Sequence, residues 1–146
     1  MKPLLIAAHA FIFLSAVFMA QAEASAAEVW TCWTSRNLGT DGKWLNRKPG
    51  EAVVGRYTIN GGKAAMAVRR PARDWSGVRD GLTVIRGSGT ITIIDVYETS
   101  DVTPAMTDVM VIDTESWAFR KMSVSPHGSG STTFFDWTTE GTCARN

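Results

Sequence analysis

Apolar and polar residues alternate with a period of two along most of the chain beyond residue 27. The alternating segments are short, rich in Val, Ile, Thr and Trp, and separated by turn residues, which is typical of β-strands. No segment of helical period lies between them, so neighbouring strands are expected to be antiparallel. The pattern predicts strands over Glu28–Ser35, Val53–Ile59, Lys63–Val68, Leu82–Arg86, Thr90–Tyr97, Met106–Ile112, Trp117–Val124 and Thr132–Thr138.

Turn residues separate these strands. Asn60-Gly61-Gly62 predicts a tight hairpin, because such turns need residues that tolerate positive φ. Asp113–Ser116 predicts a four-residue hairpin connection, and Arg69–Gly77 predicts a loop ahead of the strand at Leu82. Between Phe119 and Met122 the apolar phase of the strand changes, which predicts a β-bulge.

The first residues have the pattern of a secretory signal peptide. Lys2 precedes an apolar run, Leu4–Met19, which is followed by small residues up to Ala26. Cleavage after Ala22 or after Ala26 fits this pattern, and we expect a signal over residues 1–26 and one domain over 27–146. The alternative is a membrane anchor, but a run of about 16 residues is shorter than the roughly 20 that a span needs. We therefore expect a secreted or periplasmic protein with no membrane span after signal removal.

The two cysteines, Cys32 and Cys143, both lie in the expected mature domain. An oxidising compartment favours a disulfide between them, and two free buried thiols are the alternative. About eight antiparallel strands predict an all-β fold, either a single small barrel or a β-sandwich. A barrel is favoured because it places the first and last strands side by side, with the two cysteines at a Cα separation near 5.5–6 Å.

Composition limits the chemistry. Fifteen Lys and Arg against 14 Asp and Glu give no whole-chain argument for nucleic acid, and specific nucleic-acid binding is not expected. Two cysteines and two histidines exclude a zinc ribbon, an iron–sulfur cluster and a His-rich metal site. His127, the only histidine of the mature chain, lies in a Pro/Gly/Ser loop with no motif that fixes a nucleophile beside it. We expect no catalytic residue, no metal and no cofactor.

Charge is distributed unevenly along the chain. Residues 36–86 hold eleven Lys and Arg against four Asp and Glu, whereas residues 87–146 hold three against eight. The densest basic cluster is a candidate site for an anion or a protein partner, since arginines beside an aromatic ring can hold carboxylate, phosphate or an anionic polymer. The alternative is a solvated loop whose arginines pair with carboxylates. The cluster consists of Arg69, Arg70, Arg73 and Arg79 around Trp75.

Six tryptophans predict either a core of large aromatics or an aromatic-lined cavity. Gly42-Lys43-Trp44 resembles the Gly-x-Trp motif of the lipocalin family, which implies a barrel that carries a small apolar ligand. In that family the motif opens the first strand, whereas here it follows one. The whole pattern, with a signal, Val29–Cys32, Val111–Asp113 and Gly141–Cys143, is similar to short exported β-rich bacterial proteins of unassigned function.

Three hypotheses follow for function. The first is an exported, non-catalytic small β-barrel that binds an unknown protein partner or an anionic surface component. The second is a carrier of a small apolar ligand in a lipocalin-like barrel. The third is a hydrolase of the cell envelope or of an extracellular polymer, which would depend on His127.

Overall fold

The computed structural model of the chain describes residues 26–39, 41–48, 50–97, 106–126 and 134–146. Residues 1–25 of the predicted signal and His127 lie outside these ranges. Within them the fold is all-β, and no helix is long and apolar enough to cross a bilayer. The strands are β1 (Glu28–Leu38), β2 (Trp44–Asn46), β3 (Val54–Asn60), β4 (Lys63–Arg69), β5 (Trp75–Gly87), β6 (Thr90–Tyr97), β7 (Met106–Asp113), β8 (Ala118–Pro126) and β9 (Phe134–Arg145).

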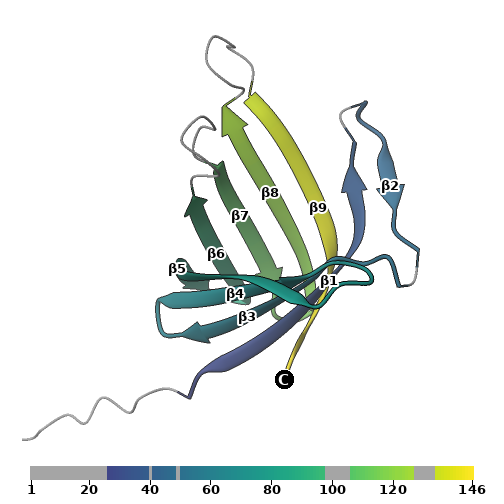
Figure 1. Cartoon of the computed structure of the whole chain (residues 1–146). Helices are drawn as coiled ribbons and strands as arrows, with labels where there is room; N and C mark the ends of the chain where they lie inside the picture. The colour runs from purple at the N-terminus through teal and green to yellow at the C-terminus, as the bar shows by residue number, and fades with distance from the viewer. Residues whose placement is uncertain (1–25, 40, 49, 98–105, 127–133) are drawn as a thin grey trace, which may run out of the picture.

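Eight of these strands close into an antiparallel barrel, and β2 is an extra strand outside the ring (Figure 1). From β3 to β9 each strand pairs with the next along the chain, and β9 returns to β1. Residues Glu28–Trp33 of β1 pair with β3, Trp30–Asn37 pair with β9 on the other edge, and Arg36–Leu38 pair with β2. The barrel is therefore confirmed, and the sandwich alternative is wrong.

The predicted disulfide is confirmed at the seam that closes the barrel. Cys32 on β1 and Cys143 on β9 are direct cross-strand partners and are bonded. Their Cα atoms lie 3.9 Å apart, closer than the expected 5.5–6 Å, because the two residues face each other on adjacent antiparallel strands. The bond joins chain positions 111 residues apart.

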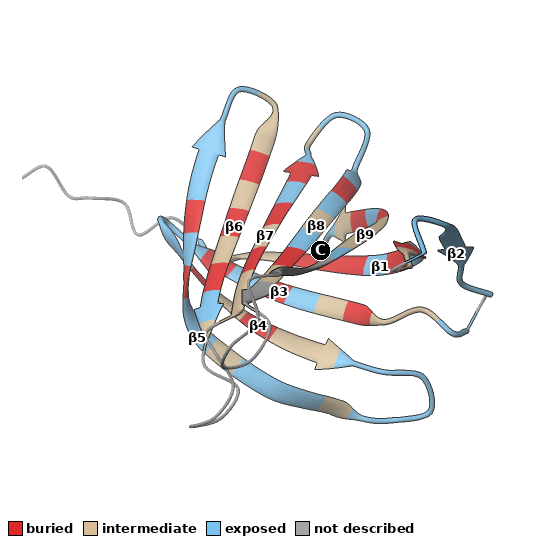
Figure 2. Ribbon diagram, turned by 90° about the horizontal axis from the view of Figure 1, so that it is seen from above, coloured by how far each residue is buried: buried red, intermediate tan, exposed pale blue. Residues whose placement is uncertain are grey.

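The interior is apolar at one end of the barrel. Buried residues alternate with exposed ones along the strands, as Figure 2 shows, and the buried ones point inward. The end closed by the tight turns at 61–62, 88–89 and 114–116 is filled by aliphatic and aromatic side chains. Gly61 takes φ +57° in the first of these turns, and this hairpin is where Asn60-Gly61-Gly62 predicted it. The core at this end includes Trp30, Ile59, Leu82, Ile91, Ile93, Met110 and Ile112.

The predicted bulge in β8 is wrong. The strand pairs in regular register with both β7 and β9 through Phe119–Val124. Phe119 is buried, Lys121 and Ser123 follow it on the inner face, and Met122 is 49% exposed on the outer face. The apolar phase changes because the inner face itself becomes polar beyond Phe119.

The predicted loop Arg69–Gly77 is shorter in the structure: residues 70–74 connect β4 to β5, and β5 already begins at Trp75. Its register against β4 shifts twice, and the two glycines beside these shifts, Gly77 and Gly81, take φ +62° and +80°. Each shift adds one residue to β5, which is how a β-bulge re-aims a side chain. As a result Arg79 lies opposite Met66 on the inner face of the barrel instead of in a loop.

Candidate functional site

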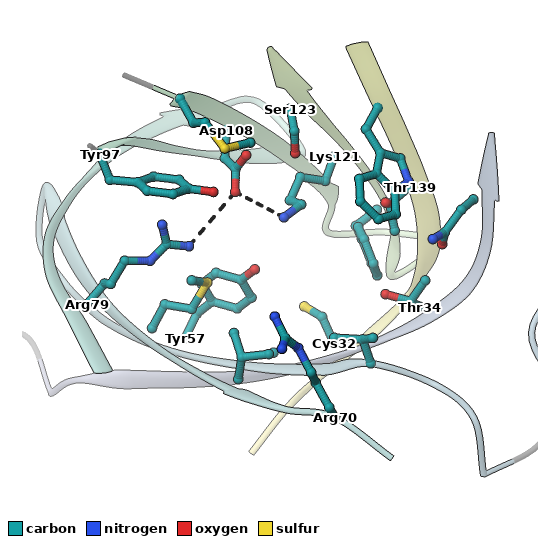
Figure 3. Close-up of a pocket in the computed structure, with 18 of the residues that line it drawn as sticks. Cys32, Thr34, Tyr57, Arg70, Arg79, Tyr97, Asp108, Lys121, Ser123 and Thr139 are labelled. Carbon is teal, nitrogen blue, oxygen red and sulfur yellow. Dashed lines mark hydrogen bonds and ion pairs between the residues drawn. The ribbon is translucent and has the colours of Figure 1, made fainter. Parts of the chain in front are cut away.

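A cavity of about 320 Å³ occupies the other end of the barrel, where β4, β6 and β8 end (Figure 3). Its five charged side chains come from five different segments of the chain, and aliphatic and aromatic residues also line it. We call this cavity the mouth pocket. Its lining includes the cations Arg47, Arg70, Arg79 and Lys121, the carboxylate Asp108, the polar residues Thr34, Asn37, Tyr57, Ser123 and Thr139, and the apolar residues Met66, Val68, Met106 and Phe119.

Two cations and two carboxylates form an ion-pair network along one wall of the mouth pocket. Arg79 Nη1 lies 2.9 Å from Asp95 Oδ2, and Arg79 Nη2 lies 3.9 Å from Asp108 Oδ2. Lys121 Nζ donates to Asp108 Oδ2 at 3.0 Å. The Arg79 guanidinium also lies over the Tyr97 ring, 3.8 Å from its centre. The network therefore neutralises its own charge and fixes Arg79 from two sides.

The two carboxylates are cross-strand partners on β6 and β7, so their charges repel each other. Burial, together with the charge of Asp108, raises the pKa of Asp95, although Arg79 and Lys121 oppose the rise. The side chain of Asp108 is only 7% exposed, and within the described ranges its Oδ1 has no hydrogen-bond partner. Asp108 thus retains a buried acceptor at the wall of the pocket. Burial also raises the pKa of Tyr57, which stays a neutral phenol.

Replacing Asp95→Asn is expected to change the pH dependence of stability. Because the pKa of Asp95 is raised above its ordinary 3.8, the folded protein holds this proton at pH values where the unfolded chain has lost it. The resulting stabilisation is complete below pH 3.8 and is lost as the pH rises through the folded-state pKa. The wild type should therefore lose stability relative to Asp95→Asn over this interval. Urea unfolding of both proteins between pH 3 and 7 measures the difference, and a difference that grows in favour of the wild type would contradict the expectation.

The structure removes Arg79 from the predicted arginine cluster and leaves Arg69, Arg70 and Arg73 along one cleft. Arg70 and Arg79 line the mouth pocket, although only Arg79 is ion-paired. Arg69 lies over the Trp75 ring on the outer face, 5.3 Å from its centre, and Arg56 approaches the same ring to 4.2 Å. Arg73 lies in the turn between β4 and β5. Among the residues that the structure describes, no carboxylate lies within ion-pair distance of Arg69, Arg70 or Arg73.

Sequence reasoning missed Asp95, Asp108 and Lys121. Each lies on the inner face of its strand, next to inner residues that are buried and apolar. These neighbours are Ile91 and Ile93 on β6, Met110 and Ile112 on β7, and Phe119 on β8. A polar residue at the next inner position of three neighbouring strands was the available signal. Apolar alternation does not reveal this signal, because it defines each face by its apolar residues only.

The tryptophans do not build the core. Trp30 is buried, but Trp33, Trp44, Trp117 and Trp137 are each 37–44% exposed. Trp44, the aromatic residue of the Gly-x-Trp motif, lies on β2 beneath the guanidinium of Arg36, 4.4 Å from the ring centre. The core is instead filled mainly by aliphatic side chains, so most of the indoles contribute to the surface and the pocket rims.

Comparison of the chain with protein-family models, with curated proteins and with solved structures finds no match. In the described ranges, no three His, Cys, Asp or Glu side chains come together where they could hold a metal ion. The mouth pocket is therefore the feature of the molecule that best indicates a function.

Proposed function

We propose that this protein is an exported, non-catalytic barrel that binds a small organic anion in its mouth pocket. The observation that carries the proposal is charge: four cationic side chains line the pocket against one carboxylate, Asp108. Asp95 lies behind the wall and pairs with Arg79. If it is counted as well, four cations still face two carboxylates. A concave site with such a surplus attracts anions, and the disulfide suits an oxidising compartment.

Arg70 is the side chain best placed to hold the anion. Arg79 and Lys121 are already paired with carboxylates, and Arg47 Nη2 lies 2.9 Å from the side-chain amide of Asn37. Arg70 has no carboxylate partner in the described part of the chain, and its guanidinium points into the pocket (Figure 3). A guanidinium forms paired hydrogen bonds with a carboxylate or a phosphate, which supports Arg70 as the anchor.

The rest of the pocket supports a ligand that carries hydroxyl groups. Thr34, Ser123 and Thr139 offer hydroxyls that can donate to or accept from such a ligand. The apolar end of the barrel, by contrast, is filled by side chains such as Ile59 and Ile112, each at most 1% exposed. The available space therefore favours a polar ligand over the small apolar ligand of the carrier hypothesis. The pocket carboxylates are engaged by Arg79 and Lys121, which favours binding over hydrolysis.

Replacing Arg70→Ser is expected to weaken the binding of galacturonate, a hydroxylated carboxylate used here as the probe, by about tenfold or more, because a hydrogen bond to a charged group contributes roughly 1.5–3 kcal/mol. Titration calorimetry measures the affinity, and neutral galactose should bind more weakly than galacturonate. The matched control is Lys63→Ser, which removes the same charge at the opposite end of the barrel. Equal binding of galactose, or equal affinity in the two variants, would overturn the proposal.

A further inference from the structure

We infer that the natural ligand is an oligosaccharide of acidic sugars, which runs from the mouth pocket across Arg70 into a second cleft on the outside of the barrel. The inference rests on the proposed function and extends it from one anionic group to several. Three observations carry it: a second basic cleft, an arginine shared by both cavities, and the chemistry of their walls.

The second cleft has a volume of about 530 Å³ and lies between the turn that follows β4 and the segment that precedes β3. We call it the outer cleft. It is lined by Arg69, Arg70 and Arg73, with Asp74 as its single carboxylate, and by the indole of Trp33, which is 38% exposed. Its lining is therefore cationic, like that of the mouth pocket.

Arg70 belongs to both cavities, and Val53 and Val54, neighbours in sequence, line one cavity each. The two cavities are thus neighbours across the barrel rim. A tight turn follows Arg70: its carbonyl accepts a hydrogen bond from the Arg73 N–H at 3.1 Å, with Ala72 at φ +55°. This turn holds Arg70 and Arg73 three positions apart on a short, defined piece of backbone. Anionic groups spaced along one ligand can therefore reach both arginines together.

The walls fit acidic sugars better than nucleic acid. Hydroxyl groups of a sugar match the hydroxyls of Thr34, Ser123 and Thr139, which line the mouth pocket. Trp33 offers a flat apolar surface to the face of one sugar ring. Non-specific nucleic-acid binding instead needs a long basic track, whereas the acidic half of the chain, residues 87–146, forms β6–β9 and would repel such a polymer. A short anionic chain that stays on the β1–β5 side avoids this repulsion.

The test compares galacturonic acid with its trimer and hexamer by titration calorimetry on the wild type, Arg73→Ser and Lys63→Ser. We expect the hexamer to bind the wild type at least about tenfold more tightly than the monomer, since a second linked contact raises avidity. Arg73→Ser should remove most of this gain and leave monomer affinity unchanged, because Arg73 lines only the outer cleft. Lys63→Ser should retain the whole gain.

Each other outcome contradicts either the inference alone or the inference together with the proposed function. If the monomer binds through Arg70 but the hexamer binds no more tightly, or if Arg73→Ser keeps the gain, the inference is wrong and the proposed function stands. If neither monomer nor hexamer binds, both fail. Maltohexaose, a neutral chain, and a ten-residue oligothymidylate complete the set: equal affinity for the former, or tighter Arg73-dependent binding of the latter, would overturn the assignment to acidic sugars.

Discussion

Replacing both Cys32 and Cys143 by alanine is expected to lower the free energy of unfolding by about 2–5 kcal/mol. The bond closes a loop of 111 residues, so its loss releases much conformational entropy in the unfolded chain. It also joins β1 to β9 at the seam of the barrel, where the two ends of the chain meet. Urea unfolding of the variant, followed by circular dichroism, measures the loss.

The wild type treated with a reductant is the control, since it breaks the same bond without removing sulfur atoms from the core. It should show a loss similar to that of the alanine variant. A loss below about 0.5 kcal/mol in both would contradict the expectation, and it would mean that the hydrogen bonds between β1 and β9 suffice to hold the seam.

Replacing Ile112→Ala is expected to cost about 2–5 kcal/mol of stability. Ile112 on β7 has no exposed surface and belongs to the core cluster at the closed end of the barrel. Truncation there removes buried methyl groups and leaves a cavity that the closed wall of strands cannot easily fill. Thermal and urea unfolding measure the cost.

Val111→Ala is the matched control, because Val111 is the preceding residue of the same strand and is 40% exposed on the outer face. Its substitution should change stability far less, close to the half kcal/mol that is usual for surface positions. Similar losses in the two variants would show that the interior of the barrel is not the main source of its stability.

Much of the fold could be predicted from the sequence because its signals are local. Alternation in Val53–Ile59 and Lys63–Val68, joined by Asn60-Gly61-Gly62, predicted a hairpin that the register of β3 and β4 confirms. Short turns between the other strands favoured antiparallel neighbours, and the positions of Cys32 and Cys143 favoured closure. These features depend on neighbours in sequence or on the two chain ends.

The site was harder to predict because it depends on two shifts of register. The bulges at Gly77 and Gly81 turn Arg79 inward, and nothing in the local pattern of Arg69–Gly77 distinguishes a bulged strand from a loop. Lys121 and Asp108 meet only after β7 and β8 pair. Their inward direction follows from strand phase, but their partnership follows from the register in which β7 and β8 pair.

The seam between β1 and β9 also determines how well an incomplete chain is protected from aggregation. Strand β9 fills the space between β1 and β8, so a chain that lacks β9 exposes the hydrogen-bonding edges of both neighbours. Unpaired edges are templates for pairing with other chains. Closure must also wait for contacts that span most of the domain, which is characteristic of slow folding. The barrel therefore gains protection from edge-to-edge aggregation only in its last step, when β9 pairs with both β1 and β8.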